Sequence, residues 1–248
     1  MATPPFGPPA HLLTPPARIG AVLFDAYGTL FDVQSVGQLA GQLFPGQGDA
    51  LAQLWRDKQI EYTRLVTMSS AGAEHYRPFW QLTRDALRWA CARLRLAADA
   101  AMLDRLMDEY RRLSPFPENL EVLRTLKARG TTAGILSNGD PEMLAAGIGH
   151  AGFTDLVRPV LSVQAVRRFK TDAAAYALGP AALGLPAREI LFVSSNGWDA
   201  VGATWFGYTT LWVNRSGAPP EELGTAPTHS GSSLRDVLPL LPLQPAPA

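Results

Sequence analysis

Four short apolar runs, separated by stretches of helical pattern, limit the folds open to this chain more than any other feature. The runs are rich in Val, Ile, Leu and Phe and cover residues 19–24, 133–136, 190–193 and 210–213. Helical patterns between them cover residues 118–129, 141–150 and 172–183. Continuous apolar strands that alternate with helices are typical of parallel sheets. The sequence therefore predicts an α/β fold with a doubly wound, mostly parallel sheet.

A long helical segment interrupts this alternation after the first strand. Residues 33–113 have no run of β-branched residues, and their apolar residues recur at helical spacing. Two prolines in LSPFPENL stop the last helix before the sheet resumes. The expected organisation is disordered proline-rich tails at 1–17 and 241–248, a Rossmann-like core domain of 18–32 and 114–240, and an inserted all-helical cap domain of 33–113.

Composition argues against several classes of partner. The chain has 22 basic and 22 acidic residues among 248, so no net charge attracts nucleic acid or an anionic membrane surface. No segment approaches the ~20 apolar residues that span a bilayer, and the amino terminus lacks a secretory signal. Cys91 is the lone cysteine, which excludes an internal disulfide framework. We expect a cytoplasmic protein without nucleic-acid or membrane partners.

Polar residues cluster where the predicted strands end. Asp25 follows the first strand, and Gly28 permits the turn after it. Because ligand groups gather at the carboxyl ends of parallel strands, these clusters should converge on Asp25. A lone strand-end carboxylate is more often a helix cap, but several converging clusters indicate a catalytic site. The other clusters are Ser137 with Asn138, Lys170 with Tyr176, and Ser194 with Asn196 and Asp199.

With these residues identified, the chain resembles the haloacid dehalogenase superfamily. Its marks are a strand-end nucleophilic Asp followed by GT, a Ser or Thr after a second strand, a Lys and a late acid, matched here by Asp25, Gly28 with Thr29, Ser137, Lys170 and Asp199. Phosphatases of the superfamily carry a second acid where this chain has Tyr27, and late carboxylates where it has Asn196. Because magnesium needs carboxylate oxygens, we expect no metal ligand and no cofactor.

Five separated segments are similar to the type II haloacid dehalogenases, which hydrolyse 2-halocarboxylic acids without a metal. The segments are FDAYGTLFDV, LWRDKQIEYT, ILSNG, LFVSSNGWDA and FGYTTLWVNR, and the resemblance covers residues 19 to about 237. It implies an (S)-2-haloacid dehalogenase that converts short 2-haloalkanoic acids to (R)-2-hydroxyacids and halide through an ester on Asp25. It also implies a homodimer formed through the helical insertion.

The resemblance assigns catalytic roles residue by residue. Asp25 is the nucleophile, Lys170 keeps it ionised, and Arg56 receives the departing halide. The residues that hold Asp25 and Lys170 and position the hydrolytic water are Thr29, Tyr176, Ser194, Asn196 and Asp199. Which of them takes the proton from the water stays open.

Substrate-binding residues follow from the same resemblance. The substrate carboxylate is bound by the Ser137 hydroxyl with the backbone N–H groups of Ala26 and Asn138. The apolar wall around the substrate chain consists of Tyr27, Ile60, Phe79 and Trp198. Asp57 follows Arg56 where the family usually has a neutral amide, and its carboxylate competes with halide for the guanidinium.

Other functions stay open at this point. A metal-dependent phosphatase with an atypical site would hydrolyse a phosphate ester, although Tyr27 and Asn196 argue against it. A non-catalytic member would bind small carboxylates or a protein partner, which requires no nucleophile. A dehalogenase could also act on fluoroacetate.

Overall fold

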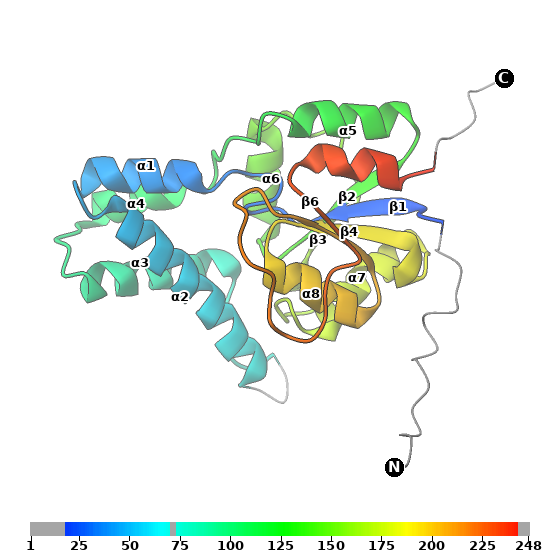
Figure 1. Cartoon of the computed structure of the whole chain (residues 1–248). Coiled ribbons are helices and arrows are strands. Elements are labelled where there is room, and N and C mark those ends of the chain that lie inside the picture. The colour runs from blue at the N-terminus through cyan, green and yellow to red at the C-terminus, as the bar shows by residue number, and fades with distance from the viewer. Residues whose placement is uncertain (1–17, 70–72, 243–248) are drawn as a thin grey trace, which may run out of the picture.

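The computed structural model confirms the α/β fold with a parallel sheet. The structure describes residues 18–69 and 73–242, in which six strands form one sheet in the order β3-β2-β1-β4-β5-β6 (Figure 1). The strands are β1 (Ala21–Phe24), β2 (Thr132–Ser137), β3 (Val160–Ser162), β4 (Ile190–Ser194), β5 (Thr209–Val213) and β6 (His229–Gly231). Each pair of neighbours is parallel.

The sequence prediction identified the four central strands but missed the two edge strands, β3 and β6. β3 and β6 have three residues each, with the sequences VLS and HSG. Val160 is 41% exposed, so β3 lacks the buried apolar run by which a central parallel strand is identified. β1 also begins at Ala21 rather than at residue 19.

The central position of β1 determines where Asp25 lies. Phe24, the last residue of β1, pairs with Ile135 on one side and Val193 on the other. The residue after β1 therefore emerges between the carboxyl ends of β2 and β4. All four side chains of β1 are at most 1% exposed, and their burial holds this strand in the middle of the molecule.

Helices cover both faces of the sheet, as expected for a doubly wound fold. They are α5 (Asn119–Ala128), α6 (Pro141–His150), α7 (Ala173–Leu183) and α8 (Gly197–Phe206), together with a 3-10 helix, Leu234–Leu240. Figure 1 shows α5 and the 3-10 helix on one face and α7 and α8 on the other. Asp172 caps α7 by accepting from the backbone N of Ala174 at 2.8 Å, and Gly184 ends it in the left-handed conformation.

The segment between β1 and α5 is helical. It contains α1 (Gln34–Leu43), α2 (Gly48–Met68), α3 (Phe79–Arg93) and α4 (Ala100–Glu109), which pack together beside the sheet (Figure 1). Leu51 and Trp55 of α2 are buried against α3, and the Trp55 indole donates to the Thr83 carbonyl at 2.7 Å. The amide of Gln59 donates to the Thr83 hydroxyl at 2.7 Å, so polar bonds fix how these two helices face each other.

The ends of the chain lie mostly outside the described residues. Of the predicted tails, residues 1–17 and 243–248 are outside them, while Leu241 is 6% exposed and packs against the core. In the described part of the chain, no helix has both the length and the apolar character needed to cross a bilayer.

Candidate active site

Asp25 occupies the first position after β1, on a turn that glycine makes possible. Its backbone N donates to the Val193 carbonyl at 2.9 Å, which extends the ladder between β1 and β4 by one residue. Gly28 has φ of +89°, in the left-handed region that favours glycine. A Cβ there would also lie 3.3 Å from Nη2 of Arg56, so a larger residue would press on this guanidinium.

The Asp25 carboxylate accepts hydrogen bonds from three separate segments. Oδ1 lies 3.1 Å from Nζ of Lys170. Oδ2 accepts from the Thr29 hydroxyl at 3.0 Å and from Nδ2 of Asn196 at 2.9 Å. Asp25 is 7% exposed, so its orientation is set by these groups rather than by water.

Lys170 lies between two carboxylates. Its Nζ is 3.1 Å from Asp25 and 2.9 Å from Asp199, and the side chain of Lys170 is 1% exposed. Burial by itself lowers the pKa of Lys170, but the charges of Asp199 and Asp25 outweigh burial and raise it. Lys170 is therefore an ammonium at neutral pH, and it bridges the two carboxylates.

Asp199 and Tyr176 extend the hydrogen-bond network of Lys170. The Tyr176 hydroxyl donates to Oδ1 of Asp199 at 2.7 Å, while Oδ2 of Asp199 faces Lys170. Burial and the Asp199 charge raise the pKa of Tyr176 well above its ordinary value, so this hydroxyl remains a donor. Both oxygens of Asp199 thus have partners within the protein.

Three strand-end residues bond to backbone rather than to the Asp25 carboxylate. Oγ of Ser137 accepts from the Gly139 N–H at 3.1 Å, and Oγ of Ser194 accepts from the Asn196 N–H at 3.2 Å. Oδ1 of Asn138 accepts from the backbone N of Lys170 at 2.9 Å. These residues shape the turns that carry the polar groups, and Ser137 and Ser194 are fully buried.

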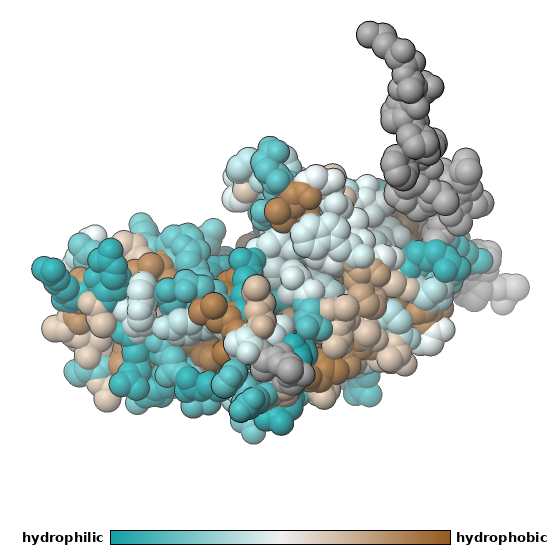
Figure 2. Space-filling model, turned by 90° about the horizontal axis from the view of Figure 1, so that it is seen from below, coloured by the Kyte–Doolittle hydropathy of each residue, from teal (hydrophilic) through white to brown (hydrophobic). Residues whose placement is uncertain are grey.

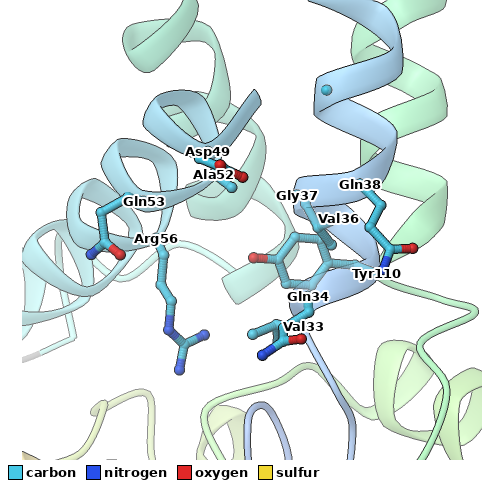
Figure 3. Close-up of a pocket in the computed structure, with 11 residues that line it drawn as sticks. Val33, Gln34, Val36, Gly37, Gln38, Asp49, Ala52, Gln53, Arg56 and Tyr110 are labelled. Atoms are coloured by element: carbon cyan, nitrogen blue, oxygen red, sulfur yellow. The ribbon is translucent and has the colours of Figure 1, made fainter. Parts of the chain in front are cut away.

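Arg56 of α2 reaches from the insertion to the sheet edge. Its Nη2 donates to Oδ1 of Asn196 at 2.7 Å and lies 3.5 Å from the Tyr27 carbonyl. Asp57 accepts from Gln53 at 2.9 Å, so it pairs along the exposed side of α2. Figure 3 shows Arg56 extending from α2 beside a cavity of about 550 Å³ that α1, α2 and Tyr110 line. Asn196 therefore connects Arg56 to Asp25.

An aromatic cluster lies next to the turn of Asp25. The Tyr27 ring has its centroid 5.9 Å from that of Phe79 and 6.0 Å from that of Tyr110. Ile60 is half-buried on α2, four residues after Arg56. The Trp198 ring is instead covered by the guanidinium of Arg64 at 5.3 Å. The structure thus brings Tyr27 and Phe79 together, and it adds Tyr110, which the sequence prediction did not include.

Asp140 is a second residue that sequence reasoning missed. Its carboxylate accepts from the backbone N of Phe79 at 2.8 Å and of Trp80 at 2.7 Å, so it caps α3 from a different part of the chain. Pro78 precedes α3 and offers no capping side chain. Burial raises the pKa of Asp140. Asp140 directly follows the strand-end segment ILSNG, which contributes Ser137 and Asn138 to the predicted site, so the same reasoning could have included it.

The donor set near Asp25 is poor in metal ligands. Within the described ranges, no group of three or more His, Cys, Asp and Glu side chains could hold a metal ion. The two acids present, Asp25 and Asp199, share the ammonium of Lys170, and a cation already occupies the space between them.

Comparison with known proteins adds independent evidence. An (S)-2-haloacid dehalogenase of Pseudomonas sp. (strain YL) is 46% identical over 222 residues, which cover 90% of this chain and 94% of that protein. A crystal structure of an L-2-haloacid dehalogenase matches with a TM-score of 0.89 at 57% identity, covering 91% of this chain and 99% of that one. The L-2-haloacid dehalogenase of Xanthobacter autotrophicus with chloropropionic acid covalently bound matches with a TM-score of 0.81 at 38% identity, covering 90% of this chain and 98% of that one.

The family of haloacid dehalogenase-like hydrolases matches residues 19–207. This range includes Asp25, Lys170 and Asp199, the three charged residues at the centre of the site. The chain belongs to the haloacid dehalogenase-like hydrolase family.

Proposed function

We propose that the protein is an (S)-2-haloacid dehalogenase, which hydrolyses short 2-haloalkanoic acids to (R)-2-hydroxyacids and halide without a metal. The observation that carries the proposal is the Asp25 carboxylate, which accepts from Thr29 and Asn196 and faces a buried ammonium at 3.1 Å. The names of the relatives, and the covalently bound chloropropionic acid in the Xanthobacter enzyme, support the same chemistry.

In the first step, an oxygen of Asp25 attacks C2 of the haloacid opposite the halogen. A carbon–oxygen bond forms, the carbon–halogen bond breaks, and the halide leaves with the bonding electrons, so C2 is inverted. Holding the two reactants in line supplies about 7–11 kcal/mol of the barrier in well-oriented systems. Arg56 is the proposed halide acceptor, and its bond to Asn196 ties it to the same network as the nucleophile.

In the second step, water attacks the carboxyl carbon of the Asp25 ester. The bond between this carbon and the ester oxygen breaks, so the substrate keeps the former Asp25 oxygen and the water oxygen enters the carboxylate. The residues proposed to position this water and stabilise Asp25 and Lys170 are Thr29, Tyr176, Ser194, Asn196 and Asp199. Asp199, the one carboxylate in this set, holds Lys170 and Tyr176 with its two oxygens. Of the two protons of the water, one completes the hydroxyl of the product and the other is released to solvent.

Recognition of the substrate is divided between the two parts of the chain. The proposed carboxylate site is the Ser137 hydroxyl with the N–H groups of Ala26 and Asn138, because donors at a turn suit an anion. The proposed wall around the carbon chain is Tyr27, Ile60, Phe79 and Trp198. The close approach of Tyr27 to Phe79 supports the wall, and the ring of Trp198 lies under the guanidinium of Arg64.

The proposed organisation is a core of residues 18–32 and 114–240 and a cap of residues 33–113 that covers Asp25. We also propose a homodimer. The insertion has exposed apolar side chains, Leu65, Met68 and Trp89, which support an interface there. Exposed apolar side chains also occur outside the insertion, and Figure 2 shows apolar surface spread over the visible face. The cytoplasmic location stays a prediction.

The test is halide release from (S)-2-chloropropionate in excess chelator. We expect release by the wild type and by Asp104→Asn, an exposed acid on α4, and none by Asp25→Asn. Release that the chelator abolishes, or that Asp25→Asn retains, would contradict the proposal. A single turnover in oxygen-18 water adds a direct check, because label must enter the Asp25 peptide if the ester forms. Magnesium-stimulated hydrolysis of a phosphate ester would instead indicate a phosphatase.

A further inference from the structure

Arg215 reaches the turn after Asp25 from the loop after β5. It follows β5, and its Nη1 donates to Oγ of Ser195 at 2.7 Å. Its Nη2 donates to the Thr29 carbonyl at 3.3 Å, and Nη1 lies 3.5 Å from the Gly28 carbonyl. One guanidinium thus joins the turn after β1 to the loop after β4.

Glu118 and Phe116 hold the guanidinium of Arg215 in place. Nη2 lies 2.9 Å from Oε1 of Glu118, and the cation lies 3.8 Å from the centre of the Phe116 ring. Burial raises the pKa of Glu118, but its own backbone N–H and Arg215 outweigh burial and lower it. Oε1 of Glu118 also accepts from the Leu234 N–H at 3.3 Å. Arg215 and Glu118 therefore form an ion pair, and each partner also bonds to the backbone. Arg215 donates to the Thr29 carbonyl, and Glu118 accepts from the Leu234 N–H.

A chain of hydrogen bonds leads from Arg215 to the nucleophile. The backbone N of Ser195 donates to Oγ1 of Thr29 at 2.8 Å. Because Oγ1 accepts there, its own proton is directed to Oδ2 of Asp25 at 3.0 Å. Displacement of Ser195 or of the Thr29 backbone would turn this hydroxyl away from the carboxylate.

We propose that Arg215 is a positioning residue for the reaction, which orients the Asp25 carboxylate through Ser195 and Thr29. This inference rests on the proposed function, because it concerns alignment of Asp25 with the carbon–halogen bond. Within the described residues, the hydrogen bonds of Arg215 go to Gly28, Thr29, Glu118, Asn119 and Ser195, a set that excludes Asp25 and the proposed substrate-carboxylate site of Ser137 and Asn138. Its removal should therefore lower kcat and leave KM nearly unchanged.

Arg215→Gln is compared with Arg235→Gln in steady-state assays with (S)-2-chloropropionate. Arg235 loses the same charge, but it pairs with Glu121 on the surface at 2.7 Å and is distant from Asp25 in the bond network. We expect kcat of Arg215→Gln to fall about tenfold to hundredfold, as small misplacements of reacting groups do, with KM within about twofold. Arg215→Lys should recover only part of kcat, because an ammonium cannot contact Ser195, Thr29 and Glu118 as a planar fork does.

Ser195→Ala provides a second route if Arg215→Gln unfolds at the assay temperature. It removes the Oγ that accepts from Arg215 but keeps the backbone N–H that donates to Thr29. We expect a several-fold loss of kcat with KM retained, and the double variant should be little slower than Arg215→Gln alone, because both changes break the same chain. Losses that multiply would contradict a shared route.

The outcomes separate this inference from the proposed function. A wild type that releases no halide from 2-haloacids would overturn both. An active wild type whose kcat stays within about twofold in folded Arg215→Gln, or in Ser195→Ala, would overturn the role of Arg215 alone. A proportional loss of kcat and folded fraction would also overturn it, since that is the effect of a purely structural residue.

Discussion

The carboxyl edge of the sheet and the helical insertion contribute to the site in different ways. At the sheet edge, the charged groups are buried and each has several partners, as Lys170 does with Asp25 and Asp199. The insertion reaches the site through individual side chains, which include Arg56 bonded to Asn196, Thr67 bonded to the backbone N of Phe169, and Phe79 packed on Tyr27, while Asp140 accepts from the α3 N–H groups. The nucleophile is therefore positioned by the fold itself, while the groups from α2 and α3 depend on how the insertion docks.

This difference has a physical origin. Parallel pairing fixes the strand ends relative to one another within one register, and the buried side chains of β1 leave no freedom to slide. Helices that pack beside a sheet have no such register and are held by individual side chains. Changes at the sheet edge should consequently affect chemistry, and changes in the insertion should affect halide departure and the fit of the substrate chain.

The largest effect is expected from Lys170→Met at the sheet edge. Without the ammonium, Asp25 and Asp199 face each other as uncompensated buried charges, and losing one partner of a buried ion pair costs about 3–5 kcal/mol of unfolding free energy. Halide release should fall by about 10²–10³-fold or more, as when a key charge-stabilising group is removed. Urea unfolding and halide assays measure the two effects.

The pH dependence of that stability has a definite sign. The pKa of Lys170 is raised above 10.5, so its contribution is fully present at neutral pH and is lost only as pH rises through the raised value. Wild type and Lys170→Met should therefore differ by a constant free energy from pH 6 to about 9 and converge at higher pH. A difference that is already lost at pH 8 would contradict the buried ion pair.

Arg56→Gln tests the contact from the insertion to the sheet edge. We expect halide release to fall about tenfold to hundredfold, because a cation that meets the departing charge is lost. Chloride should be affected more than bromide, since it is the poorer leaving group. Arg84→Gln on α3 is the matched control, because Arg84 pairs with Asp104 on the surface at 2.7 Å instead. Equal losses for the two arginines, or for the two halogens, would count against this role.

Asp140→Asn tests how α3 is docked. The amide oxygen can replace one of the two bonds to the α3 N–H groups, so we expect a loss of about 1 kcal/mol and a several-fold higher KM for longer 2-haloacids. Asp155→Asn, the same change at an exposed acid after α6, should alter neither quantity. Unchanged unfolding free energy in Asp140→Asn would rule out the cap.

The stability that Asp140 contributes should depend on pH with a sign opposite to that of ordinary surface acids. Burial raises the pKa of Asp140, so the folded state binds its proton more tightly than the unfolded state. Stability from this group is thus greatest below the ordinary value of 3.8 and decreases as pH rises through the raised pKa. Relative to Asp140→Asn, the wild type should lose stability over this window in thermal unfolding measured at several pH values.

The smallest effect is expected on the outer side of the insertion. Nζ of Lys58 lies 3.9 Å from the centre of the Trp89 ring and 2.7 Å from Glu61. Lys58→Met should cost about 0.5–1 kcal/mol in unfolding free energy and leave halide release unchanged. Glu61→Gln, which removes only the exposed ion pair, should cost less. A large loss of activity in Lys58→Met would contradict the division between the two regions.

Much of the site could be predicted from sequence because its residues directly follow strands. Asp25, Asn138 and Ser194 are identified by the apolar runs that precede them, and parallel topology brings such positions to one edge. The edge strands were missed because each has three residues, none of them buried, and so carries no continuous buried apolar run. Ser137 was identified correctly as a strand-end residue, although its bond to Gly139 depends on the turn after β2.

Local sequence by itself determined the central strands, the helical character of the insertion and the glycine turn after Asp25, because each depends on neighbouring residues. Only the tertiary structure decided that Asp140 caps α3, that Tyr110 packs on Tyr27, and that Arg215 donates to the Thr29 carbonyl. These contacts join segments from 60 to 187 positions apart, and the local pattern does not indicate which residues meet. Packing of one element on another creates them, and packing is a property of the whole chain.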